Sequence, residues 1–192
     1  MIATLAAVFF ALDILLLAAF QVIDRDYGLF DHAVSDYGIS RTAGLFRAYV
    51  IVGSLAAPLL AFLFWQSRTP LYPAAIPVYL LLLMLAQVVL GLYPNDLRGA
   101  PRTASGNIHH AATLIAFTCA YLTIAEATPL LVATSPLGPM LLWIKHSFSL
   151  GFVAVVLTIS PPLRPWFGLA ERVFLYSCAT WFLFVSLSFE GV

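Results

Sequence analysis

The chain has 192 residues, of which 62% are hydrophobic and only 9% are charged, and its mean hydropathy is +0.97. A soluble domain has about 25% charged residues, so this composition excludes an ordinary soluble protein and predicts a multi-pass integral membrane protein. The 9 Lys and Arg residues balance the 9 Asp and Glu residues, so no basic surface suggests a nucleic acid as partner.

Six apolar runs are long enough to cross the hydrocarbon core of a bilayer, which takes about 20 residues. We predict helices over residues 3–23, 44–66, 72–93, 108–128, 137–160 and 168–190. Short connections rich in Pro and Gly separate them, so we predict an all-α fold, a single polytopic transmembrane bundle over residues 1–192 without a soluble domain. The first run carries Asp13 at its centre and follows no basic segment, which favours a retained helix over a cleaved signal peptide.

Most of the cationic side chains fall on one side of this predicted topology, in or beside the first, third and fifth loops. They are Arg25, Arg41, Arg47, Arg98, Arg102, Arg164 and Arg172. The opposite side has only Arg68 and the more deeply placed Lys145. Because short loops rich in Lys and Arg remain in the cytoplasm, we predict that both termini lie outside the cytoplasm.

The first and third loops share a pattern. Gly28 to Gly44 reads GLFDHAVSDYGISRTAG, and Gly91 to Gly106 reads GLYPNDLRGAPRTASG. Both begin with Gly-Leu-aromatic, carry Asp early and have Arg-Thr-Ala near the end. The match favours a bundle built from repeated helical hairpins, although two loops rich in Gly and Asp also match by chance.

The same two loops bring carboxylates and imidazoles to one side of the membrane. The candidate ligand or metal site consists of Asp36, Asp96, His109 and His110. Such a cluster could bind a divalent metal, position a water for hydrolysis, or hold a polar head group with the help of the arginines. His109 and His110 point about 100° apart on a helix, so at most one of them is a ligand. Alternatively, Asp36 and Asp96 cap the following helices or pair with arginines and hold the loops down.

Four ionisable residues lie inside the predicted spans, away from these loops. They are Asp13, Glu126, Lys145 and His146. A charge at the bilayer centre costs about 3 kcal/mol even on the most lenient scale, so each side chain should face the bundle and have a partner. Their depths predict two pairs, Asp13 with His146 and Glu126 with Lys145. Such pairs either fix the register of the helices or form part of a path for protons or ions.

Three short motifs resemble a known family. Ser35-Asp36-Tyr37-Gly38 follows the first helix, Gly91-Leu92-Tyr93-Pro94-Asn95-Asp96 ends the third, and Gly106 with His109 or His110 opens the fourth. They resemble a prokaryotic six-helix membrane family known as domain of unknown function nine hundred and ninety-eight. The resemblance spans most of the chain and implies six helices and a bacterial or archaeal cytoplasmic membrane. It implies no activity.

Three hypotheses about function follow. The first is a non-catalytic accessory or scaffold subunit that packs with lipids, other membrane proteins or a second copy; small residues at four-residue spacing on several helices favour it. The second is a membrane-embedded, metal-dependent hydrolase of lipid head groups that uses Asp36, Asp96 and a histidine. The third is a small ion- or proton-coupled transporter that uses the intramembrane ionisable residues. We favour the first, because the sequence has no recognisable catalytic motif and indicates no particular cofactor.

Overall fold

The computed structural model describes residues 1–67, 73–96 and 99–189. Six α-helices account for most of this part of the chain: α1 Ile2–Ile23, α2 Ala43–Gln66, α3 Ala75–Leu92, α4 Ala104–Thr134, α5 Gly138–Leu157 and α6 Phe167–Ser188. Two short 3₁₀ helices, η1 Val34–Ile39 and η2 Arg164–Trp166, lie in the first and fifth loops. All six α-helices are long and apolar enough to span a membrane. The predicted six-helix membrane bundle is therefore confirmed.

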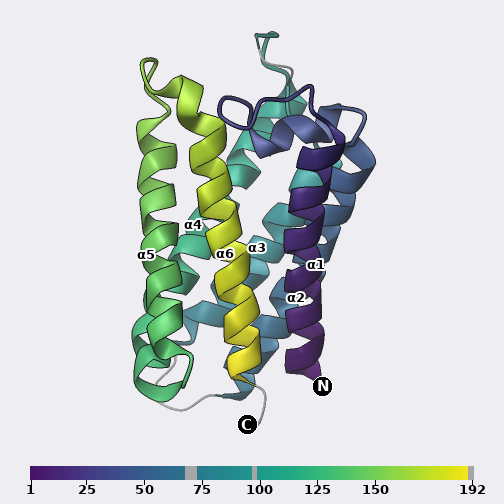
Figure 1. Cartoon of the computed structure of the whole chain (residues 1–192). Coiled ribbons are helices and arrows are strands. Elements are labelled where there is room, and N and C mark those ends of the chain that lie inside the picture. The colour runs from purple at the N-terminus through teal and green to yellow at the C-terminus, as the bar shows by residue number, and fades with distance from the viewer. Residues whose placement is uncertain (68–72, 97–98, 190–192) are drawn as a thin grey trace.

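The helices form a closed circle. Each one packs against its neighbours in sequence, and α6 returns to pack against α1. Figure 1 shows the first, third and fifth loops at one end of the bundle and both termini at the other. Helix α5 lies at the periphery of this circle, where it packs against α4 and α6. These two helices also contact each other directly.

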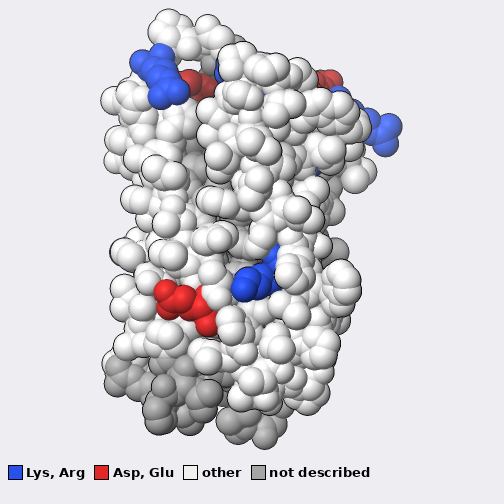
Figure 2. Space-filling view, turned by 90° about the vertical axis from the view of Figure 1, so that its left-hand side faces the viewer, with Lys and Arg blue, Asp and Glu red and all other residues white. Residues whose placement is uncertain are grey.

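Small side chains allow the helices to approach closely. Ala6, Ala56 and Ala127 are completely buried, as expected where helix contacts in lipid depend on close van der Waals packing. The outward-facing positions carry large apolar residues such as Leu15 and Leu150. On the side shown in Figure 2, charged side chains gather near the loop end, and the face below is uncharged apart from one acidic and one basic group in its lower half. This distribution suits a surface in contact with lipid tails.

Helix α4 is longer than the sequence predicted, because it runs over Ala104–Thr134 where we expected residues 108–128. At its start, Thr103 is the N-cap and its hydroxyl oxygen accepts a hydrogen bond from the Gly106 N–H at 3.1 Å. At its end, Pro129 lies inside the helix. A proline removes only its own N–H donor, and membrane helices tolerate this loss, so the apolar turn after Pro129 continues the helix.

Asp36 and Asp96 both accept hydrogen bonds at the start of a helix, but neither is the N-cap that the structural alternative expected, because the N-caps are Ala33 for η1 and Thr103 for α4. Asp96 accepts hydrogen bonds from both the hydroxyl and the N–H of Thr103, at 2.6 and 3.0 Å. Asp36 accepts a hydrogen bond from the Ala33 N–H at 3.0 Å, at the start of η1. The first loop thus contains a 3₁₀ helix, whereas the third loop has none in its described residues, so the repeat of the two loops does not extend to their local structure.

The cap at α4 predicts a dependence of stability on pH. The hydrogen bonds from Thr103 lower the pKa of Asp96 below its ordinary value of 3.8. A carboxylate with a lowered pKa in the folded state stabilises the protein above the unfolded-state pKa, and this contribution is lost as pH falls through the folded-state pKa. We therefore expect Asp96→Asn to lower the melting temperature in detergent at neutral pH. The difference in melting temperature between Asp96→Asn and the wild type should become smaller below about pH 4.

The matched control is Asp26→Asn, the same chemical change at an exposed carboxylate of the first loop. It should leave the melting curve unchanged at neutral pH. A difference between wild type and Asp96→Asn that stays constant over the whole acid range would contradict the capping role.

Candidate functional site

A cavity of about 90 Å³, which we call the central chamber, lies inside the circle of helices. Its described lining comes from α1, α2, α3, α4, α6 and η1, and much of it is aromatic or aliphatic. The polar lining residues are Asp13, Ser35, Tyr49, Gln87, His109, Thr113 and Glu171. The volume has room for a few water molecules or a small ion, well below the roughly 300–1,000 Å³ of a drug-sized site.

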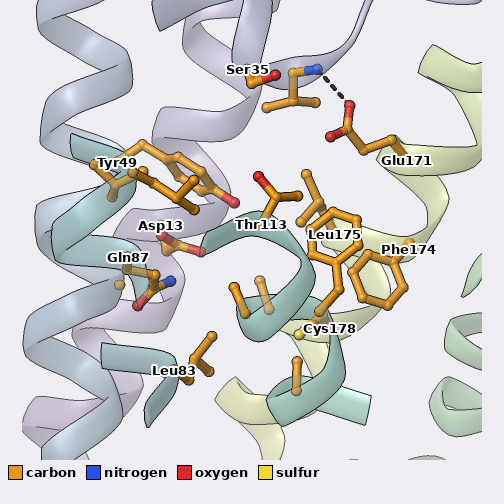
Figure 3. A pocket seen from close by; sticks show the side chains of 18 of the residues that line it. Asp13, Ser35, Tyr49, Leu83, Gln87, Thr113, Glu171, Phe174, Leu175 and Cys178 are labelled. Atoms are coloured by element: carbon orange, nitrogen blue, oxygen red, sulfur yellow. Dashed lines mark hydrogen bonds between the residues drawn. The ribbon is translucent and has the colours of Figure 1, made fainter. Parts of the chain in front are cut away.

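Asp13 is the most unusual of these residues. It lies on the bundle-facing stripe of α1 between Phe10 and Leu17, and only 6% of its surface is exposed. Its Oδ1 atom has no hydrogen-bond partner in the described part of the chain. Figure 3 shows the carboxyl group pointing into the central chamber. Because an isolated buried carboxylate is very costly, Asp13 requires either a proton or a bound cation.

A second unpaired oxygen lines the same chamber. Gln87 on α3 has its Oε1 atom buried without a hydrogen-bond partner among the described residues. Its amide packs against Gly53 on α2, where a Cβ atom would meet the Gln87 nitrogen, so the glycine leaves room for this side chain. In Figure 3, Gln87 and Tyr49 approach the chamber from the same side as Asp13. Carboxylate, amide and hydroxyl oxygens are ligands that suit a proton or a small hard cation.

The first loop closes the loop-side end of the chamber. Val34 and Ser35 of η1 line it, and the Val34 N–H donates to Oε2 of Glu171 on α6 at 2.6 Å. Glu171 is buried, so this contact joins η1 to α6 inside the protein. The N-terminus of η1 thereby receives a carboxylate, which satisfies an N–H group that the short helix leaves free.

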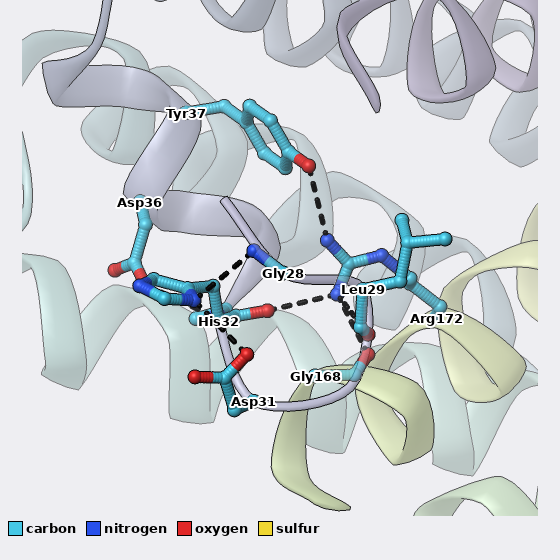
Figure 4. A network of polar contacts seen from close by, with 9 residues as sticks. Gly28, Leu29, Asp31, His32, Asp36, Tyr37, Gly168 and Arg172 are labelled. Carbon is cyan, nitrogen blue, oxygen red and sulfur yellow. Dashed lines mark hydrogen bonds and ion pairs between the residues drawn. The ribbon is translucent and has the colours of Figure 1, made fainter. Parts of the chain in front are cut away.

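Arg172 clamps the rest of the first loop, as Figure 4 shows. The side chain is only 5% exposed. Its guanidinium group donates to the carbonyl oxygens of Leu29, His32 and Gly168, to Oε1 of Gln21 and to the hydroxyl of Tyr37, over 2.8–3.3 Å. The planar guanidinium supplies donors in several directions, which lysine cannot do. From the sequence we expected only a topological role for Arg172 and none for Glu171, although both lie within the last apolar run.

A second cavity of about 440 Å³, the loop pocket, lies on the other side of η1. Its polar lining residues are Asp36, Asn95, Asp96, Arg102, His110, Thr158 and Arg164. The two adjacent histidines line different cavities. His109 is 2% exposed, lines the central chamber and has Nδ1 2.8 Å from the Tyr93 carbonyl oxygen, whereas His110 is exposed and lines the loop pocket.

The predicted cluster of Asp36, Asp96, His109 and His110 is therefore divided. Three of its members border the loop pocket, and His109 faces the interior of the bundle. Among the described residues, no group of three His, Cys, Asp or Glu side chains is arranged to hold a metal ion. The two carboxylates instead accept hydrogen bonds from the loop backbone.

A family model matches nearly the whole chain. The family model described as protein of unknown function (DUF998) covers residues 2–188, from the start of α1 to the end of α6. The chain belongs to the DUF998 family. No curated protein and no solved structure matches it.

Neither of the two predicted intramembrane pairs forms in this DUF998 protein. Asp13 faces the central chamber, whereas His146 is exposed on α5, and α1 packs against α2 and α6 instead of α5. Glu126 accepts a hydrogen bond from the Tyr79 hydroxyl at 3.2 Å. It forms no ion pair with Lys145 within the described chain. Asp13 and His146 fail to pair because their helices are not neighbours, whereas Glu126 and Lys145 lie on neighbouring helices and Glu126 bonds Tyr79 on α3 instead.

The Arg172 clamp can be tested by substitution. Arg172→Met removes the donor from two buried acceptors, the Gly168 carbonyl and the Tyr37 hydroxyl, and from three half-buried ones, and a buried acceptor left unpaired costs about 1–3 kcal/mol. We expect the free energy of unfolding to fall by about 3 kcal/mol, with a smaller loss for Arg172→Lys, which keeps the charge but not the planar fork. Trypsin should cleave faster at the exposed Arg25 and Arg41, because the first loop loses its attachment to α6.

The control is Arg47→Met, at an exposed position near the start of α2. It should leave both the melting curve and the cleavage pattern unchanged. Unaltered cleavage of the first loop in Arg172→Met would show that the clamp does not hold this loop.

Proposed function

We propose that this protein is a small ion- or proton-coupled transporter and that Asp13 is the carboxyl group that binds the coupled proton or cation. The observation that carries the proposal is the Asp13 Oδ1 atom, buried in the central chamber without a partner among the described residues. A buried carboxylate with a structural role is normally paired or hydrogen-bonded. A carboxylate that is left open toward a chamber suits reversible binding of a positive charge.

The rest of the chamber supports a small ligand. Gln87 and Tyr49 add oxygen atoms near Asp13, and the remaining walls are mostly apolar. In an apolar environment a bound cation or a proton neutralises Asp13, so the occupied site is far less costly than the empty, ionised one. Proton and cation then compete for one carboxyl group, which is the basis for exchanging one for the other.

The two cavities suggest a route into the chamber from the loop side. The loop pocket ends at η1, and Ser35, His109 and Glu171 lie beyond it on the chamber side. At the other end of the bundle, large buried side chains such as Trp181, Phe64 and Ile76 fill the interior. This arrangement corresponds to a carrier state closed toward the side of the termini, with η1 as the barrier on the loop side.

The arginines support an orientation for this carrier. Arg25, Arg41, Arg102 and Arg164 all belong to loops at the end opposite the termini, and the positive-inside rule assigns such an end to the cytoplasm. We therefore propose a bacterial or archaeal cytoplasmic membrane with both termini outside. An accessory role with other membrane proteins remains a second candidate, because His146 on α5 is ionisable and yet exposed toward lipid. The hydrolase has less support, since the loop carboxylates accept hydrogen bonds at helix starts.

Reconstituted vesicles with a pH-sensitive dye inside test the transporter. Addition of Na⁺ or K⁺ outside should raise the internal pH as protons leave in exchange. We expect Asp13→Asn to abolish the response and Asp13→Glu to retain part of it, because only a carboxyl group can alternate between proton and cation. Asp26→Asn, the same change in an exposed loop, should respond like the wild type. Equal responses of wild type and Asp13→Asn would rule out this role of Asp13.

A second measurement does not depend on the transported ion. A hydrophobic carbodiimide reacts with protonated carboxyl groups inside membranes, and mass spectrometry locates the product. We expect modification at Asp13 that slows as pH rises or as the coupled cation is added. Labelling confined to the loop carboxylates would contradict an accessible, protonatable Asp13.

A further inference from the structure

A group of polar side chains interrupts the lipid-facing side of α3, α4 and α5. We call it the outer-face patch; it consists of Tyr79, Glu126, Lys145 and His146. Glu126 and Lys145 are half-buried and His146 is exposed. Figure 2, which views the bundle from the side of α5, shows an acidic and a basic group on the lower half of a face whose other charged groups lie at the loop end. The patch is separate from the central chamber, to which none of the four residues contributes.

The two opposite charges of the patch are not satisfied within the described chain. The Tyr79 hydroxyl donates to Glu126 at 3.2 Å, but no ion pair reaches either Glu126 or Lys145. Lys145 has no hydrogen-bond partner in the part of the chain that the structure describes. Apolar residues on this face need no explanation in a membrane, whereas unpaired ionisable residues do, because they are costly in hydrocarbon.

Glu126 and Lys145 lie at the same depth. Tyr121 on α4 contacts Phe148 and Phe152 on α5, with ring centroids 6.1 and 4.9 Å apart. Tyr121 therefore lies level with the stretch of α5 between Phe148 and Phe152. Because the two helices are antiparallel, five residues forward from Tyr121 to Glu126 and about five residues back from the middle of that stretch to Lys145 reach the same depth. Lys145 is seven residues beyond Gly138, the first residue of α5. At 1.5 Å per residue this places it about 10 Å from the helix end.

We propose that the outer-face patch is the contact surface between two copies of this chain, in which Glu126 of each copy pairs with Lys145 of the other. Copies inserted in the same orientation can form a two-fold dimer only about an axis along the membrane normal, so every side chain keeps its depth. Each residue at the interface then contacts residues of the second copy that lie at the same depth in the membrane. Glu126 and Lys145 satisfy this condition, and the two pairs form together.

Charge complementarity favours a second copy over a lipid. A patch with one carboxylate and one ammonium group is complementary to itself under a two-fold rotation. An anionic phospholipid brings a phosphate without a compensating cation, which attracts Lys145 but repels Glu126. Trp143, which is 75% exposed, contacts the His146 ring and adds a large apolar side chain at the edge of the patch.

Charge exchange between two variants tests the proposal. Glu126→Lys and Lys145→Glu each place like charges opposite one another in a dimer of identical chains, so each alone should dimerise about tenfold more weakly or worse. When the two variants are mixed, both contacts again join opposite charges. We expect the mixed dimer to form, detected by native mass spectrometry in nanodiscs and by co-purification of two differently tagged chains. The double variant Glu126→Lys with Lys145→Glu should dimerise like the wild type.

The singly substituted chains must first show wild-type helix content and a single unfolding transition. If either fails, Glu126→Gln and Lys145→Met replace them, with weakened dimers as the expected result. Wild-type chains that remain monomeric would overturn the proposal, as would single variants that dimerise normally. A monomer that carries one tightly bound lipid, lost on Lys145→Met, would also overturn it and would assign the patch to a lipid.

Discussion

The buried guanidinium of Arg172 is the contact on which the loop end of the bundle depends. A loop that folds inward at the end of a transmembrane bundle takes its carbonyl groups away from bulk water, so donors from the protein itself must satisfy many of them. Arg172 supplies them to Leu29 and His32, and Glu171 supplies an acceptor to Val34. Two consecutive residues of α6 thus convert the first loop from a surface connection into the cover of the central chamber.

This cover separates two environments. On one side of η1, the loop pocket has charged and polar walls open to solvent-exposed loops. On the other side, the central chamber has mostly apolar walls with a few polar groups. His109 and His110 are adjacent in sequence yet face different cavities, because neighbouring residues on a helix point about 100° apart. A change in the position of η1 would alter both cavities together, which couples the loop side to the interior of the bundle.

The sequence predicted the helices well and the site only in part, for physical reasons. Hydropathy determines which segments enter the bilayer, so all six spans were found. It does not determine a helix end within a polar stretch, where the side chain of Thr103 starts α4 earlier than expected. The depth of a residue in the membrane can also be predicted from the sequence, but which helices pack against one another cannot. Asp13 and His146 failed as a pair because the circle of helices separates α1 from α5. The burial of Glu171 and Arg172 was not expected, because charged residues near a helix end usually lie at the surface.

The contrast between Arg172 and Asp13 distinguishes structural from functional polarity in this protein. Both are nearly completely buried ionisable residues, and each would be costly in hydrocarbon if it had no partner. Arg172 has hydrogen bonds in every direction, and its removal should damage the fold. Asp13 has an oxygen without a partner in the described chain, so its removal should relieve an unfavourable burial instead. If Asp13→Asn proves at least as stable as the wild type, the carboxyl group is not there for the fold, and the binding of a proton or cation is the remaining reason for its presence.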